Sequence, residues 1–182
     1  MGKIIVAEFL TLDGVMEAPE QWQFPFQSPD AHEFVTQQIQ ELDGQLLGRN
    51  TYEIFANFWP TQTNNEFGIA DKLNSMPKYV VSTTLQEATW NNSTLISENV
   101  VETLMVLKQK TGGNIGIPGS RTLIQSLMQT GVIDEYQLLI YPIVLGSGSR
   151  LFDDAMTNQP MKLIDAKTFE SGALALTYQP QR

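Results

Sequence analysis

The 182-residue chain contains no cysteine and a single histidine, His32. The absence of cysteine excludes a disulfide framework, a cysteine-ligated zinc site and a thiol nucleophile. One histidine excludes a multi-histidine metal site, so we expect no bound metal. Basic residues are also few, 11 against 20 acidic ones, and the net charge of −9 comes without any cluster of Lys and Arg. Nucleic-acid binding depends on such clusters to neutralise phosphates, so we expect no nucleic-acid partner.

Long apolar runs are missing as well. No stretch comes near the roughly 18 uninterrupted apolar residues of a transmembrane helix, so we expect no membrane partner. The first residues lack the apolar region and the cleavage site of a signal peptide, which makes the cytoplasm the expected location. Apolar residues nevertheless make up 42% of the chain. That share is enough for one domain over 1–182 with a hydrophobic core.

Strand-like apolar segments alternate with amphipathic, helix-like segments, which predicts an α/β fold with a sheet covered by helices. The predicted strands span residues 3–10, 45–48, 78–83, 93–96, 114–117, 134–145, 161–170 and 173–179, the last two as an antiparallel pair. The predicted helices, with their caps, span residues 28–44, 50–58, 67–75, 97–112 and 121–131. Pro142 predicts a bulge or an edge position inside its strand. The loop over 11–27 is long, and such loops tend to be functional.

Three segments, 46–51, 80–84 and 117–122, share one design. In each, a strand leads into a turn of small residues with hydroxyl groups or an arginine, and in two of them a helix follows at once. The N-terminus of a helix presents unpaired N–H groups and a positive dipole, which suit phosphate. Each turn alone is commonly plain capping, but three in one chain indicate a dinucleotide-binding protein. The Rossmann glycine fingerprint is absent.

Two groups of residues carry a resemblance to known families. Gly48-Arg49-Asn50-Thr51 is similar to the Gly-Arg-x-Thr helix start of dihydrofolate reductases, which place a hydroxyl pair where Ser82-Thr83 stands. A second group resembles one branch more closely, namely segments 12–14, 118–123, 131–135, 142–146 and 149–152. That branch is the reductase domain at the C-terminus of the bifunctional riboflavin-biosynthesis deaminase-reductase, with its stand-alone relatives. The resemblance spans nearly the whole chain.

This resemblance implies a dihydrofolate reductase-like fold of three layers: a mostly parallel central sheet with an antiparallel C-terminal strand, and helices on both faces. It also implies NADPH as hydride donor and a homodimer. Carried over residue by residue, the cofactor site comprises Gly48, Arg49, Thr51, Ser82, Thr83, Pro118, Gly119, Ser120, Arg121 and Thr122. Arg49 and Ser82 would lie near the adenosine 2′-phosphate, and 119–122 would cradle the pyrophosphate. Pro118 replaces the first glycine of a pair common in these enzymes, which removes one backbone N–H.

The substrate side offers three acidic candidates for a catalytic role: Asp30, Glu33 and Asp13. In dihydrofolate reductases a single acid early in the first helix meets the pterin, and Asp30 and Glu33 stand near that place. Asp30 can equally be a helix-dipole residue, Glu33 a surface group and Asp13 a turn residue. A set of aromatic residues either walls a flat heterocycle pocket or covers the core edge or a subunit interface. The set is Trp22, Phe24, Phe26, Phe58 and Trp59.

The resemblance predicts an NADPH-dependent oxidoreductase that transfers a hydride to a small heterocyclic or ribosyl-heterocyclic substrate. Its named relative is the pyrimidine reductase of riboflavin biosynthesis, the 5-amino-6-(5-phosphoribosylamino)uracil reductase. No deaminase domain with zinc-binding Cys and His accompanies it, so the substrate can differ. Three alternatives stay open: a dihydrofolate reductase, a non-catalytic nucleotide-binding module on the same fold, and a pure interaction protein.

Overall fold

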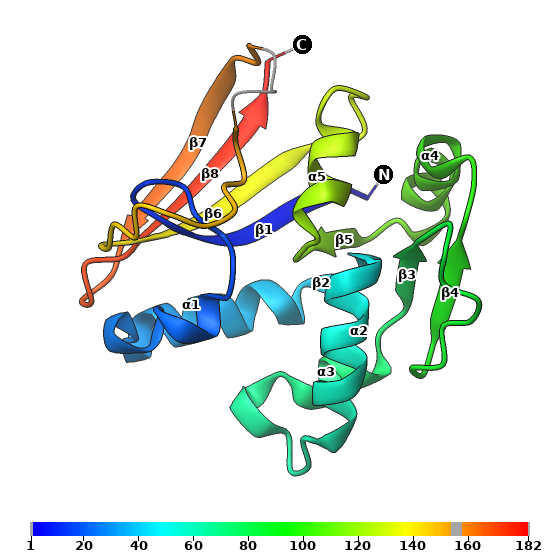
Figure 1. The fold of residues 1–182 in the computed structure, drawn as a ribbon, viewed down its shortest axis with the longest axis horizontal. Helices are drawn as coiled ribbons and strands as arrows, with labels where there is room; N and C mark the ends of the chain where they lie inside the picture. Colours follow the sequence, from blue (N-terminus) through cyan, green and yellow to red (C-terminus); the bar gives the residue numbers. More distant parts are fainter. Residues whose placement is uncertain (1, 154–157, 182) are drawn as a thin grey trace.

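A computed structural model describes residues 2–153 and 158–181. Within them, eight strands form one sheet in the order β4-β3-β2-β5-β1-β6-β8-β7 (Figure 1). The strands are β1 (Ile4–Thr11), β2 (Leu42–Gly48), β3 (Lys78–Val81), β4 (Ser93–Ile96), β5 (Asn114–Ile117), β6 (Glu135–Tyr141), β7 (Met161–Thr168) and β8 (Leu174–Pro180). Neighbours from β4 to β6 are parallel, and β8 runs antiparallel to both β6 and β7. The predicted mostly parallel sheet with an antiparallel C-terminal strand is confirmed.

Helices cover both faces of this sheet. They are α1 (Pro29–Gln40), α2 (Arg49–Phe58), α3 (Ala70–Ser75), α4 (Val100–Thr111) and α5 (Arg121–Met128), with short 3-10 turns η1 (Pro19–Gln21), η2 (Phe24–Phe26), η3 (Trp59–Thr61) and η4 (Glu66–Gly68). Consecutive strand residues face opposite sides, and Leu46 packs with α4 and α5 whereas Leu47 packs with Tyr52 of α2. Thus α1 and α2 cover one face, and α4 and α5 the other (Figure 1). Among the residues described, no helix combines the length and apolar character that a bilayer span requires.

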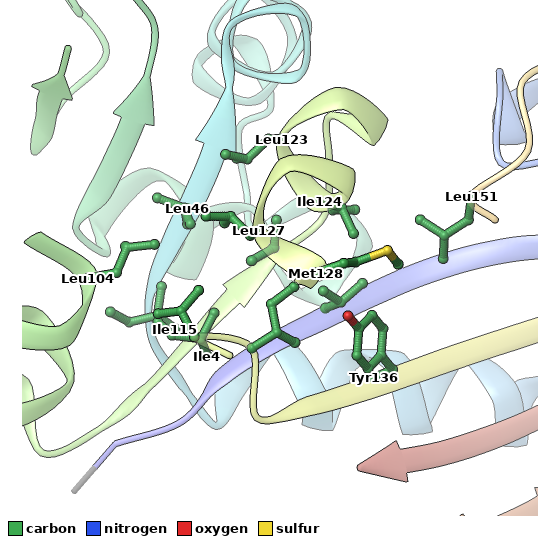
Figure 2. Packing of buried hydrophobic residues seen from close by; sticks show 14 of the residues in the cluster. Ile4, Leu46, Leu104, Ile115, Leu123, Ile124, Leu127, Met128, Tyr136 and Leu151 are labelled. Atoms are coloured by element: carbon green, nitrogen blue, oxygen red, sulfur yellow. The ribbon is translucent and has the colours of Figure 1, made fainter. Parts of the chain in front are cut away.

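The largest core cluster lies between α4, α5 and the central strands (Figure 2). Helix α5 contributes four buried side chains at helical spacing: Leu123, Ile124, Leu127 and Met128. This spacing gives one continuous apolar stripe, which is why the segment packs as an amphipathic helix. Fully burying a side chain of this kind stabilises the fold by about 1.5–3 kcal/mol. The stripe therefore fixes α5 on the sheet, and with it the place where the helix begins.

Three predicted helix boundaries are wrong, each for a local reason. Helix α1 ends at Gln40, because residues from 42 onward already pair in β2, and Gly44 lies inside that strand. The helix expected over 67–75 shrinks to α3, since Phe67 has a left-handed φ of 59°. The cap of α4 is Asn99, with a φ of 49°, and not Ser97. Residues with positive φ interrupt a right-handed helix, and the spacing of apolar residues along the sequence does not reveal them.

The predicted strand over 134–145 is also too long. Strand β6 stops at Tyr141, immediately before Pro142. Proline has no N–H to continue the ladder, so it ends the strand instead of forming a bulge inside it. The chain then leaves the sheet, and the backbone N–H groups of Leu145 and Gly146 donate to the carboxylate of Asp13.

Candidate functional site

Two helix N-termini meet at one edge of the sheet. Helix α2 follows β2 directly, and α5 follows β5 after a three-residue turn. Because β2 and β5 are parallel neighbours, both helices begin at the same carboxyl edge. The backbone N–H of Gly48 donates to the carbonyl of Gly119 at 3.1 Å, which joins the two connections directly. Ligands of open α/β sheets bind at this edge.

We call the contact between the β2–α2 and β5–α5 connections the joint. Glycine is required on both sides of it, at Gly48 and at Gly119. A Cβ on Gly48 would stand 2.2 Å from the Ser120 Oγ, and a Cβ on Gly119 would stand 2.6 Å from the Thr51 Oγ1. Gly119 also has a φ of 130°, which side chains rarely adopt. The peptide bond between Gly119 and Ser120 is cis. The close approach brings the hydroxyl groups of Thr51 and Ser120 to the junction of the two helices.

Neither helix N-terminus carries a side-chain cap. Gly48 caps α2 and Ser120 caps α5, and no side-chain hydrogen bond is made at either cap position. The N–H groups of a first helical turn have no acceptor inside their own helix, and they carry the positive end of the dipole. Two such ends side by side suit an anionic group such as phosphate. The joint therefore offers the positive ends of two helix dipoles in a chain with a net charge of −9.

Arg49 extends the site from α2 toward the end of β3. Its Nη1 donates to the Thr84 Oγ1 at 2.7 Å, and its Nε pairs with Glu53 at 2.8 Å. The Oγ of buried Ser82 accepts the backbone N–H groups of Leu85 and Thr84 at 2.9 and 3.2 Å, so Ser82 shapes this turn. Thr84 is the residue that sequence reasoning missed here. The run of hydroxyl residues 82–84 was the signal, but the sequence does not show which of these residues contacts Arg49.

The remaining predicted cofactor residues divide into two groups. Pro118 lies half-buried at the end of β5, and Thr83 and Thr122 are exposed. Arg121 turns away toward a later loop, where its Nε donates to the carbonyl of Arg150 at 2.7 Å and its guanidinium pairs with Asp153. The structure therefore gathers the glycines and hydroxyls at the joint but engages the arginine of α5 elsewhere. That any of these residues binds a cofactor stays a prediction.

Asp13 is held as a structural anchor. Its carboxylate accepts the Thr11 hydroxyl at 2.6 Å and the backbone N–H groups of Gly146 and Leu145 at 2.8 and 3.2 Å. Arg150 lies 3.5 Å away and also donates to the Asp13 carbonyl. The hydrogen bond from Thr11, followed by those from the backbone, lowers the pKa of Asp13 to about 2. At neutral pH the group is a carboxylate, so it holds no proton to donate.

Asp30 is likewise held by hydrogen bonds, and a catalytic role for Asp30 or Glu33 stays a prediction. The Asp30 carboxylate accepts the Ser28 hydroxyl at 2.5 Å and the backbone N–H of Glu170 at 3.1 Å. It thus ties the start of α1 to the turn between β7 and β8. The hydrogen bond from Ser28 is the largest cause that lowers its pKa below the usual value. Glu33 is exposed on α1.

A fourth acid, which sequence reasoning missed, lies in the middle of the sheet. Glu8 sits in β1, with only 7% of the residue exposed. Its Oε1 is buried without a hydrogen-bond partner, and burial raises the pKa of Glu8 well above its ordinary value. The signal was a charged residue inside the apolar run that forms β1. The apolar run by itself predicts only a buried strand.

The predicted aromatic set does not form one wall. Trp22 is buried against Tyr141, with ring centroids 5.5 Å apart, in a core cluster that also takes Phe26. Phe58 and Trp59 lie at the far end of α2, with centroids 5.0 Å apart, beside Phe67. Phe24 is exposed. Trp22 and Phe26 therefore cover a core edge, whereas Phe58 and Trp59 belong to a separate, partly exposed cluster.

Two cavities of about 210 and 180 Å³ lie away from the joint. The larger is apolar, between β6, β8 and residue 152, and the smaller is polar, beside Lys3 and Glu135. Neither is lined by a predicted site residue. Within residues 2–153 and 158–181, no group of three or more His, Asp or Glu side chains is arranged to hold a metal ion.

The fold and the joint of two helix N-termini define a dihydrofolate reductase-like α/β protein. A dihydrofolate reductase from Enterococcus faecalis, complexed with NADP(H), superposes with a TM-score of 0.64 at 15% identity, over 100% of this chain and 98% of that chain. The chain belongs to the RibD C-terminal domain family, whose model matches residues 2–175. The family resemblance read from the sequence is therefore confirmed.

Two further proteins match over almost their whole length. A putative riboflavin biosynthesis protein from Shewanella sp. PV-4 has a TM-score of 0.78 at 23% identity, over 99% of each chain. The uncharacterized protein YyaP of Bacillus subtilis is 30% identical over 179 residues, 97% of this chain and 94% of that protein.

Proposed function

We propose that this protein is an NADPH-dependent oxidoreductase that transfers a hydride to a small heterocyclic or ribosyl-heterocyclic substrate. The observation that carries the proposal is the joint at which Gly48 meets Ser120 and Gly119 meets Thr51. Two uncapped helix N-termini at one sheet edge suit the pyrophosphate of a dinucleotide. Membership of the RibD C-terminal domain family supports the same conclusion.

The residues at the joint fit this cofactor. The two glycines leave no Cβ in the way of a phosphate, and Thr51 and Ser120 supply hydroxyl donors beside the N–H groups. Arg49, with Thr84 and Ser82 behind it, provides a cation and hydroxyls for a 2′-phosphate one strand further along. When bound, the reduced nicotinamide supplies the hydride, and the protein supplies binding and orientation.

For the substrate, we favour a pyrimidine of the kind reduced in riboflavin biosynthesis. The Shewanella neighbour carries that pathway in its name, and the family model is that of the RibD C-terminal domain. The same proposal includes a single domain, a homodimer and action in the cytoplasm. Dihydrofolate is the other reductase substrate to test.

A non-catalytic nucleotide-binding module is the second candidate, and one observation favours it. Asp13 and Asp30, the acids best placed by resemblance, are both fixed by hydrogen bonds as carboxylates. A reductase needs a group that delivers a proton. Binding of NADPH without turnover of any substrate in a panel of pyrimidines and pterins would support this second function.

Thermal unfolding with NADPH, and with NADH for comparison, tests the cofactor. Ligand at 100 times its Kd adds about 2.7 kcal/mol of stability, which for a chain of this size raises Tm by about 5–10 °C. The Arg49→Ala variant should lose affinity for NADPH far more than for NADH. Lys110→Ala, an exposed cation on α4, is the charge-matched control and should change neither. Equal losses for both nucleotides in Arg49→Ala would show that Arg49 does not read the 2′-phosphate.

A further inference from the structure

The acidic side chain of Glu8 is buried and has no compensating partner among the described residues. Its neighbours on the same face of β1, Val6 and Leu10, belong to the main core cluster. No described residue donates a hydrogen bond to its Oε1, and no described cation pairs with it. Burying an uncompensated carboxylate is strongly unfavourable, so such a group keeps its proton.

The strand register places Glu8 beside the start of α5. Val6 pairs with Ile117, the last residue of β5. Two residues further on, Glu8 therefore lies alongside the turn through Pro118 and Gly119 that leads into α5. Side chains alternate along a strand, so Glu8 faces the side of the sheet that α5 covers. Figure 2 shows the side chains of α5 gathered over β1 on this side.

The charged and titratable groups on the surrounding elements do not neutralise Glu8. Strand β5 contains none. On β6, Tyr136 shares the face, and its hydroxyl is likewise buried without a partner. On α5, Arg121 is paired with Asp153. In the loop after β6, Arg150 is engaged with Asp13. An ionised Glu8 would therefore add an unscreened negative charge on the sheet side of the first turn of α5.

We propose that Glu8 must keep its proton for a dinucleotide to bind at the N-terminus of α5. The inference rests on the proposed function, because it takes the ligand to be a dinucleotide phosphate. An ionised Glu8 repels the phosphates through an interior of low dielectric and opposes the helix dipole that attracts them. Coupling is reciprocal, so bound phosphates in turn strengthen the hold of Glu8 on its proton.

The test is the affinity for NADPH between pH 5.5 and 9.5, measured by calorimetry for the wild type and for Glu8→Gln. In the wild type, Kd should rise by up to tenfold per pH unit once Glu8 ionises in the protein without ligand. The neutral amide of Glu8→Gln should remove that rise. Titration of the 2′-phosphate affects both proteins equally, so the difference between the two profiles is the readout.

Two further variants guard the interpretation. Glu8→Met replaces the carboxyl with an apolar side chain of similar size and should also remove the rise if Glu8→Gln fails to fold. Tyr136→Phe deletes the other unpartnered hydroxyl on this face and should keep the wild-type profile.

Calorimetry in two buffers of different ionisation enthalpy should show proton uptake on binding in the wild type and a smaller uptake in Glu8→Gln. Parallel profiles would overturn the role of Glu8 and leave the cofactor proposal intact, whereas no binding of NADPH at any pH would overturn both.

Discussion

Replacing Gly48 by Ala probes the joint between α2 and α5 most directly. Gly48 has ordinary extended backbone angles, with φ of −74° and ψ of 160°, so alanine introduces no backbone strain there. The whole effect comes from a Cβ placed 2.2 Å from the Ser120 Oγ and 3.0 Å from the Ser120 Cβ. Overpacking of this kind destabilises a protein by about 1–3 kcal/mol. For a chain of this length, Tm should fall by about 2–4 °C for each kcal/mol.

A double-mutant cycle isolates the contact that we hold responsible. In a Ser120→Ala background the nearest atom, the Oγ, is gone, and only the contacts near 3.0 Å remain. Gly48→Ala should then destabilise by less than about half as much, which gives a coupling free energy on the order of 1 kcal/mol. Thermal and urea unfolding of the four proteins measures it. An equal loss in both backgrounds would refute the assignment of the clash to Ser120.

Two other predictions concern buried charge and pH. Asp13→Asn should destabilise the protein above pH 4, and the difference in unfolding free energy from the wild type should shrink as pH falls. The lowered pKa of Asp13 contributes stability above the unfolded value near 3.8, and this stability is lost as pH falls toward about 2. Urea unfolding at pH 7 and pH 3 checks this, and an equal difference at both pH values would contradict it. Lys78→Met should destabilise by about 1–3 kcal/mol, because the Lys78 Nζ donates to the carbonyls of Leu73 and Asn74, both at 2.9 Å, at the end of α3. The control is Lys72→Met, the same exchange at a partly exposed position of α3, which should leave Tm nearly unchanged.

The layered fold was predictable because its signals are repeated over many residues. Apolar runs marked the strands, and spacings such as that of Leu123, Ile124, Leu127 and Met128 marked a helix with one buried face. The edges of elements were less predictable. A positive φ at Phe67 or Asn99 is a conformation of one residue, and the pattern of apolar and polar residues does not contain it.

The candidate site was predictable in part for the same reason. Gly48 and Gly119 belong to recognisable strand-turn-helix segments, and the structure places them together. The choice of Thr84 as the residue that contacts Arg49, and the engagement of Arg121 by Asp153, depend on side chains more than 25 positions apart in sequence. Glu8 was missed because its significance lies in the lack of a partner, which no sequence pattern expresses.

The Gly48–Gly119 bond has a consequence for how the chain tolerates insertions. Helix α2 lies on one face of the sheet and α5 on the other, yet one backbone hydrogen bond joins the connections that lead into them. Adding or deleting a residue in either connection would move one helix relative to the other and break the contact. Engineered length changes should therefore be tolerated poorly at 48–49 and 118–120. They should be tolerated better in the loop between η3 and η4, at residues 63–64, where both residues are exposed.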